Sequence, residues 1–183
     1  MDILSHGLWG GATVGRKSKR RFWTAFAFGV FPDAFAFGLP FSHLLYSFLN
    51  GYTPAVMIRP GVGHVDIPAY VFQLYDISHS LVVFSFAFLL VWAIRKNLPV
   101  PQGSSRQTGP LWEMLAWGFH IVMDIFTHSD AFFPTPFLWP ISDFHVNGMS
   151  WGQPQIFISN VTLLAILYAY WWYRRRASRQ KSA

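Results

Sequence analysis

The stretch GFHIVMDIFTHSD, residues 118–130, decides the expected fold because it places ionisable side chains at regular intervals in an apolar segment. His120, Asp124 and His128 are spaced four residues apart, about one helical turn, so they share one face of an α-helix. Such groups are costly to bury, and the common reasons to tolerate them are a bound cation, mutual pairing or a proton path. The stretch therefore predicts a buried helix that carries a functional site.

The composition of the chain places this helix in a membrane protein. Of the 183 residues, 52% are hydrophobic and only 12% are charged, which is too apolar for an ordinary soluble domain. The 19 Phe and 9 Trp suit a lipid-facing surface with Trp at the interfaces. The first residues, MDILSHGLWGG, lack the basic and long apolar regions of a cleaved signal peptide. We expect a single all-α, polytopic membrane domain spanning residues 1–183.

The basic residues indicate how this domain lies in its membrane. The net charge is +6, and thirteen of the fourteen Lys and Arg residues fall in three clusters, at 16–21, 95–106 and 174–181. The three clusters flank apolar runs and would all lie on one side of a bilayer, whereas Arg59 falls in a loop on the other side. The positive-inside rule then predicts that all three clusters, and with them the C-terminus, lie in the cytoplasm. Topology accounts for the basic excess, so membrane lipid is the expected partner and nucleic acid is not. The oligomeric state is left open.

Four apolar stretches have about the 20 residues that a spanning helix needs, at 22–49, 68–94, 111–128 and 155–173. Because Pro32 and Pro40 interrupt the first stretch and Asp33 lies in its middle, we expect a half-helix over 22–31 followed by a second piece. Residues 2–15 predict a short N-terminal helix that carries His6 and does not span. Outer loops are expected at 50–67 and 129–154, a polar inner linker at 95–110, and a lipid-contacting tail at 174–183.

The ionisable residues of these segments share one predicted depth. Counting about 1.5 Å per residue from the basic boundaries places His6 and His120 at about 15 Å, Asp33 at about 18 Å, Asp124 at about 21 Å and His79 at about 22 Å. These positions form a layer about 7 Å thick in the outer half of a hydrocarbon core of roughly 30 Å. Residues from four segments at one depth predict one common site.

The side chains of this layer restrict its chemistry. His and Asp ligands without Cys favour zinc, manganese or iron, and a metal held by two His and two Asp lowers the pKa of a bound water. Asp124, midway between two histidines, is the natural bridging ligand if two metals bind. The residues alone leave a second class open, a protein without catalytic activity in which the cluster holds a structural metal or conducts protons or ions.

The segments MDILSHGLWG, FGVFPDAFAFG, YDISHSLVV and HIVMDIFTHSDAFFPTPFLWPISDF resemble the membrane-bound metal-dependent hydrolases, over most of the chain. Their order also resembles the helical superfamily of zinc phospholipases C and single-strand nucleases. The resemblance implies a first divalent metal, zinc by analogy, on Asp33, His79, His120 and Asp124. It implies a second metal on His6 with a shared Asp124, and a third on His128 with His145. The implied reaction is hydrolysis of a phosphoester or a lipid headgroup, with Asp124, His128 and Asp33 as the catalytic candidates.

The chain departs from that family at two places. The family's His-Arg-Gly-x-Thr-His-Ser block corresponds to residues 74–80, LYDISHS, which lack the first histidine and the arginine. The superfamily's last metal site has an acidic residue four positions after its histidine. In this chain the residue four positions after His145 is Met149, which is not acidic. Several assignments stay open at this point. Asp130 is an alternative ligand to His128, Asp143 lies in the same loop, Asp76 is a candidate to orient His79, Glu113 is expected at the membrane interface, and His43 and His64 are expected at the surface.

Overall fold

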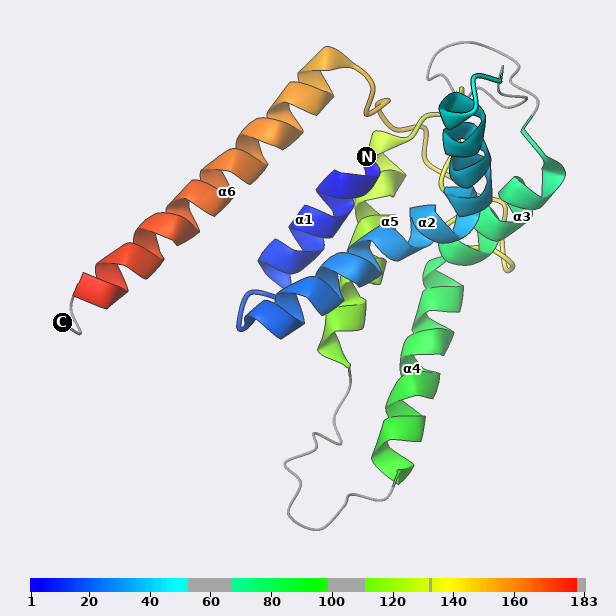
Figure 1. Ribbon diagram of the computed structural model, residues 1–183. Helices are drawn as coiled ribbons and strands as arrows, with labels where there is room; N and C mark the ends of the chain where they lie inside the picture. Colours follow the sequence, from blue (N-terminus) through cyan, green and yellow to red (C-terminus); the bar gives the residue numbers. More distant parts are fainter. Residues whose placement is uncertain (53–66, 99–110, 132, 181–183) are drawn as a thin grey trace.

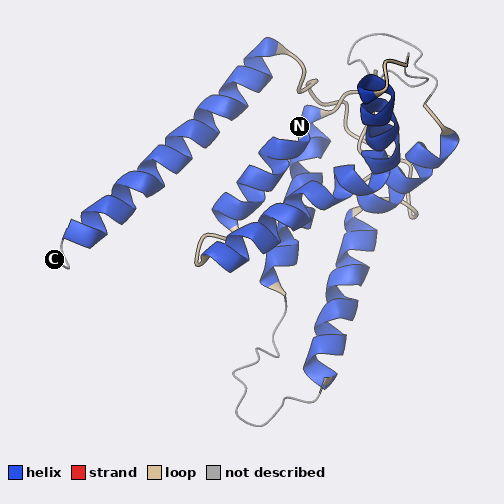
Figure 2. Cartoon of the chain, viewed as in Figure 1, coloured by secondary structure: helices blue, strands red, loops and turns tan. Residues whose placement is uncertain are grey.

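The computed structural model describes residues 1–52, 67–98, 111–131 and 133–180 (Figure 1). Within these ranges the chain is helical and forms no strand, which confirms the predicted all-α class (Figure 2). The elements are α1 (Ile3–Thr13), α2 (Lys19–Leu49), α3 (Ala69–Ser78), α4 (Leu81–Asn97), the short 3-10 helix η1 (Trp112–Met114), α5 (Leu115–Thr127) and α6 (Pro154–Gln180). The predicted loop positions with Arg59, His64 and Arg106 lie outside the described residues.

Helices α1, α2 and α5 pack together at the centre of the molecule (Figure 1). Glycines permit the close approach of α1 to its neighbours. A Cβ atom added at Gly10 would lie 2.8 Å from the Ala25 carbonyl oxygen, and one added at Gly29 would lie 2.5 Å from the His6 carbonyl oxygen. These backbone contacts bring His6 of α1 against the middle of α2.

Helix α2 differs from the predicted pair of helical pieces. It is continuous over 31 residues with Pro32 and Pro40 inside it, and its blue and teal parts run in different directions (Figure 1). A proline removes one N–H donor and bends a helix without necessarily ending it, so the predicted end at residue 31 was wrong. The buried Asp33 follows Pro32 on the side of α2 that faces the centre.

The break expected in the first apolar stretch occurs in the second one. Helices α3 and α4 meet at an angle of 58°. Ser80 begins α4 as its N-cap, since its hydroxyl accepts hydrogen bonds from the backbone N–H groups of Val82 and Val83 at 3.1 Å. His79 lies in the break and is fully buried.

Two described helices are long and apolar enough to cross a membrane, α2 and the Pro154–Ala177 part of α6, and the bent pair α3–α4 makes a third if it counts as one span. The structure does not confirm the predicted four passes. The stretch 111–128 contributes η1 and the 13-residue α5, which is about 20 Å long and therefore shorter than a hydrocarbon core of roughly 30 Å. Two or three candidate spans are consistent with membrane association.

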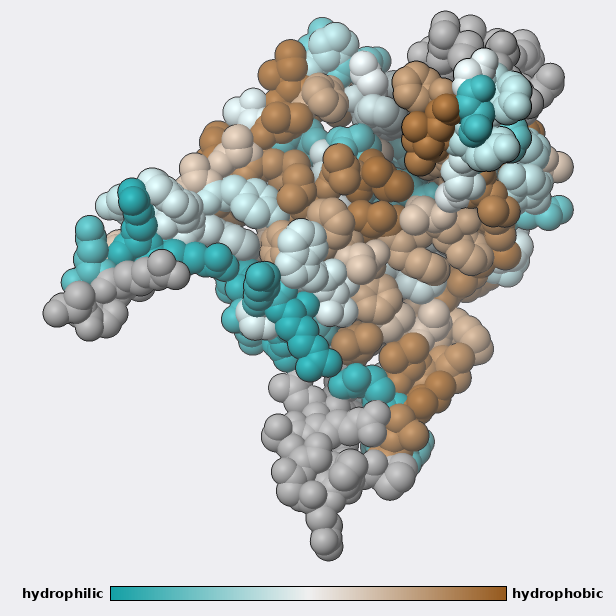
Figure 3. Space-filling view, viewed as in Figure 1, coloured by the Kyte–Doolittle hydropathy of each residue, from teal (hydrophilic) through white to brown (hydrophobic). Residues whose placement is uncertain are grey.

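The polarity of the surface follows the predicted grouping of basic residues. In Figure 3 hydrophilic residues form a band across the lower part of the molecule, along the C-terminal part of α6, the α1–α2 turn and the end of α4. Apolar residues dominate the surface above this band and along α4. The described basic clusters therefore lie toward one edge of the apolar body.

Candidate metal centre

Four side chains from three segments, α2, the α3–α4 break and α5, converge inside the protein. Within the described ranges, Asp33, His79, His120 and Asp124 form the one group of His and carboxylate side chains with ligand atoms all within 4.8 Å of one another. His120 Nε2 lies 3.1 Å from His79 Nε2 and 3.0 Å from Asp124 Oδ2. His79 Nε2 lies 3.5 Å from Asp33 Oδ1 and 3.6 Å from Asp124 Oδ2. All four side chains are buried, so the predicted convergence is confirmed for these residues.

Backbone carbonyls determine which imidazole nitrogens carry the protons. His120 Nδ1 lies 2.7 Å from the Gly29 carbonyl oxygen, and a carbonyl only accepts, so this nitrogen is the donor. His79 Nδ1 lies 3.3 Å from the Tyr75 carbonyl oxygen and 3.0 Å from Ser78 Oγ, which place a proton there as well. In the neutral form, both Nε2 atoms then present lone pairs to each other and to two carboxylates. A positive charge must lie between these four acceptors, either a proton on an imidazole or a metal ion.

The spacing of the four acceptors fits a metal ion. Bonds of about 2.0–2.1 Å in a tetrahedron separate the ligand atoms by about 3.3–3.4 Å. The five measured separations among the four groups run from 3.0 to 3.9 Å. The hydrogen bonds at the two Nδ1 atoms also fix the ring orientations, as outer partners do around metal-bound histidines. Two nitrogen and two carboxylate ligands suit zinc, manganese or iron.

Asp124 directs its two oxygens to different partners. Oδ2 faces the four-residue cluster, while Oδ1 contacts His6 Nε2 at 3.0 Å, the amino group of Met1, and His128 Nε2 at 3.9 Å. His6 is fully buried and stacks on the His120 ring at 3.6 Å, and among the described residues its Nδ1 has no hydrogen-bond partner. Burial lowers the pKa of His6 to about 4, which leaves the neutral imidazole that binds metals. The bridging role of Asp124 and the ligand roles of His6 and His128 stay predictions.

Tyr75 is a site residue that the sequence analysis did not select. Its hydroxyl lies 2.8 Å from His128 Nδ1 and donates to the Phe133 carbonyl oxygen at 3.2 Å, and its ring stacks on His79 at 3.8 Å. Because the hydroxyl proton goes to the carbonyl, the hydroxyl accepts the His128 Nδ1 proton. Tyr75 precedes His79 by four residues on α3, a helical spacing that could have indicated the shared face.

The polar residues of the long loop between α5 and α6 lie apart from the cluster. His145 Nε2 pairs with Asp130 Oδ1 at 3.2 Å, and both side chains are exposed, at 42% and 52%. His145 Nδ1 lies 3.0 Å from the Asp143 carbonyl oxygen. The structure therefore does not bring His145 to His128, as a third metal site would require.

The surroundings of two other polar residues are now defined. Ser78 and the Tyr75 carbonyl, in place of Asp76, contact His79 Nδ1. Glu113 is buried and its carboxylate lies 3.1 Å from Arg21 Nε, so it forms an ion pair, while its depth at the membrane interface stays a prediction. A buried carboxylate needs such a partner because desolvation is costly. His43 is exposed, as expected.

The fold and the cluster define an all-helical protein with two or three candidate membrane spans and a buried Asp–His–His–Asp group that can hold a metal ion. In comparisons with known proteins, no family model, no curated protein and no solved structure matches the chain. The resemblance to membrane-bound metal-dependent hydrolases stays a prediction.

Proposed function

We propose that this protein is a membrane-embedded metal-dependent hydrolase in which Asp33, His79, His120 and Asp124 hold a divalent metal, zinc in the first instance. One observation supports this proposal more than any other. Two imidazole Nε2 atoms, each with its proton displaced to Nδ1, and two carboxylates converge in a buried site. A metal cation accepts the lone pairs of all four groups, which a single proton does not.

The chemistry that zinc supplies is activation of a bound water, whose pKa falls to about 7. The side chains around the cluster then have separate tasks. Hydrogen bonds from His79 and His120 to backbone and hydroxyl oxygens hold both rings in place. His128 Nε2 is the base that takes a proton, because its Nδ1 proton is held by Tyr75. Asp124 faces both the metal ligands and His128, and thus connects binding with proton transfer.

The substrate class that we propose is a phosphoester, a membrane lipid headgroup in particular. The resemblance to zinc phospholipases supports the phosphoester, and the candidate spans support a lipid source. Asp33 is the most exposed of the four ligands at 8%, so substrate would approach past α2. We further propose that the site lies in the outer half of a bacterial inner membrane with the C-terminus in the cytoplasm.

A proton-conducting protein is the rival class, and the packing below the cluster argues against it. A proton path needs polar groups across the membrane. Met114, Trp117 and Ile121 of η1 and α5 form a buried apolar cluster, and the first two lie between Glu113 and His120 along the chain. Glu113 itself is paired with Arg21. In the part of the chain that the structure describes, this packing supports a localised site.

The deciding experiment is the metal content of the protein purified without chelators, measured by inductively coupled plasma mass spectrometry. We expect at least one zinc, manganese or iron per chain, and its loss in His120→Ala and Asp124→Asn. The matched control is Asp130→Asn, which changes an exposed carboxylate outside the cluster and retains the metal. A wild-type protein without stoichiometric metal would refute the metal site.

Catalysis needs a separate measurement. We expect metal-loaded protein to hydrolyse members of a panel of phosphoesters that includes membrane phospholipids, and His128→Ala to lose turnover while it keeps the first metal. If the metal is bound but no phosphoester is hydrolysed, and chelation only lowers the thermal stability, the metal is structural and the hydrolase proposal is wrong.

A further inference from the structure

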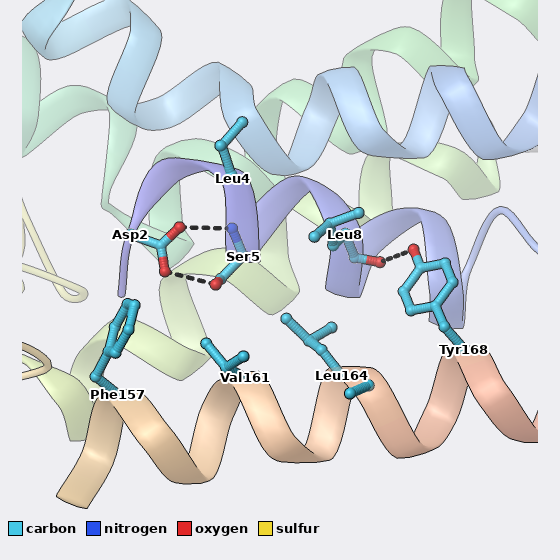
Figure 4. A pocket seen from close by; sticks show the side chains of 9 residues that line it. Asp2, Leu4, Ser5, Leu8, Phe157, Val161, Leu164 and Tyr168 are labelled. Carbon is cyan, nitrogen blue, oxygen red and sulfur yellow. Dashed lines mark hydrogen bonds between the residues drawn. The ribbon is translucent and has the colours of Figure 1, made fainter. Parts of the chain in front are cut away.

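A hollow lies between α1 and α6, on the opposite side of α1 from α2 (Figure 4). We call it the α1–α6 slot, and its volume is about 410 Å³, within the range of small-molecule pockets. Val161 and Leu164 of α6 point toward α1, and Leu8 of α1 lies opposite them (Figure 4). The residues that line the slot are Asp2, Leu4, Ser5, Leu8, Phe157, Val161, Leu164, Ala165 and Tyr168.

Hydrogen bonds at both ends of the slot hold α6 at its distance from α1. At one end, the buried Asn160 donates to Ser5 Oγ at 2.7 Å and accepts from Trp9 Nε1 at 2.8 Å. At the other end, the Tyr168 hydroxyl donates to the Leu8 carbonyl oxygen at 3.0 Å. The two α6 residues are eight positions apart, about 12 Å along the helix. The slot is therefore a fixed gap and not a loose contact between the helices.

The slot is polar at one end and apolar along its length. Ser5 donates to Asp2 at the Asn160 end, so the polar groups there are satisfied among themselves. Leu164 is the most buried apolar residue of its α6 wall, at 6% exposure, while Val161 is 46% exposed. Because α6 is a candidate membrane span, this apolar lining lies where lipid chains are the surrounding solvent.

Basic residues gather beyond the Tyr168 end. Arg174, Arg175 and Arg176 follow Tyr168 on α6 and are exposed, about 9–12 Å further along the helix. Helix α1 runs in the same direction as α6, since Ser5 pairs with Asn160 and Leu8 with Tyr168. Arg16 and Lys17, which follow the C-terminal end of α1, therefore lie toward the same end of the slot. Figure 3 shows the hydrophilic band that these segments share. An apolar slot that ends at a group of cations matches a lipid with an anionic headgroup.

We propose that the α1–α6 slot binds one acyl chain of an anionic phospholipid whose phosphate lies at the basic residues after Tyr168. The chain runs from the basic residues along the open side of the slot, past the Tyr168–Leu8 hydrogen bond and toward Asn160, and covers the gap that the two sets of hydrogen bonds maintain. The lipid joins α6 to the rest of the protein and does not take part in the hydrolysis proposed above.

The test is a titration of the purified protein in detergent with phosphatidylglycerol, followed by native mass spectrometry, with phosphatidylcholine of the same chains as the comparison lipid. We expect one tightly bound phosphatidylglycerol per chain, with affinity roughly tenfold above phosphatidylcholine, about 1.4 kcal/mol. Val161→Trp fills the slot and should weaken phosphatidylglycerol binding by at least roughly tenfold. The matched control is Ile166→Trp, on the same helix, exposed and outside the slot.

A second variant tests lipid binding without changing the packing between α1 and α6. Replacement of Arg174, Arg175 and Arg176 by Gln changes exposed residues only, and should reduce phosphatidylglycerol binding to the level of phosphatidylcholine. The proposal is overturned if Val161→Trp binds phosphatidylglycerol as the wild type does, or if both lipids bind equally. It is also overturned if the purified protein is a dimer that Val161→Trp dissociates, since a second copy would then occupy the slot.

Discussion

The replacement of Gly29 by alanine tests the link between helix packing and the metal centre without changing a polar group. The new Cβ atom would lie 2.5 Å from the His6 carbonyl oxygen and 3.0 Å from the His6 carbonyl carbon. Both are backbone atoms of α1 and cannot rotate away. Since ordinary contacts begin near 3.4 Å, α1 must move away from α2 by about 1 Å.

This displacement reaches the metal ligands in two ways. The Gly29 carbonyl accepts the Nδ1 proton of His120 at 2.7 Å, so a shift in α2 disturbs the orientation of that ring. His6, on the displaced α1, stacks on the same ring at 3.6 Å. We expect zinc affinity to fall by roughly 10–100-fold, which is the usual effect of disturbing a hydrogen-bond partner of a metal ligand. The overpacking should lower the free energy of unfolding by about 1–3 kcal/mol.

The matched control is Gly38→Ala, on the same helix, where an added Cβ atom has no neighbour within 4 Å. Alanine favours a helix over glycine by about 1 kcal/mol, so this variant should be as stable as the wild type or more so. Zinc affinity is measured by competition with a chromophoric chelator, and stability by thermal unfolding followed by circular dichroism. The reasoning fails if Gly29→Ala loses stability but binds zinc as tightly as Gly38→Ala does.

Three further substitutions follow from single contacts. Tyr75→Phe should retain the metal, measured by mass spectrometry, but reduce phosphoester turnover by roughly tenfold or more, because His128 Nδ1 loses the oxygen that orients it; equal turnover would contradict the role of His128 as the base. Asn160→Leu should lower the free energy of unfolding by about 1–2 kcal/mol, because Trp9 and Ser5 lose a buried hydrogen-bond partner. An unchanged thermal unfolding curve would argue against the fixed position of α6. Ser80→Ala should cost about 1 kcal/mol through loss of the N-cap of α4, measured by the same unfolding assay, and a neutral effect would show that the break does not depend on the cap.

Helical spacing and depth predicted one common site that also included His6, and the resemblance singled out Asp33, His79, His120 and Asp124 as one ligand set. His120 and Asp124 are one turn apart on an apolar helix and must share a face. Asp33 and His79 were brought to the same layer by counting residues from the basic boundaries, and burial of a charge demands a partner wherever it lies. The structure places all four within 4.8 Å.

The sequence could not predict how the helices end, because neighbours decide this. Pro32 looked like a helix end, yet α2 continues through it, since one missing hydrogen bond is outweighed by packing on both sides. The partner of Glu113, Arg21, was not predicted because it belongs to a distant segment. Tyr75 was not among the predicted site residues, because only the folded position of His128 gives its hydroxyl a role.

The break between α3 and α4 and the metal centre depend on each other. A broken helix leaves backbone groups without helical partners, and inside a protein these groups need other hydrogen-bond partners. The Ser78 carbonyl accepts from Trp117 Nε1 at 2.7 Å, and the Leu81 N–H donates to the Phe137 carbonyl at 2.9 Å. These bonds connect the break to α5 and to the loop that follows α5, the two elements that flank the site. These bonds hold His79 between the two elements. In a continuous helix its side chain would point in another direction.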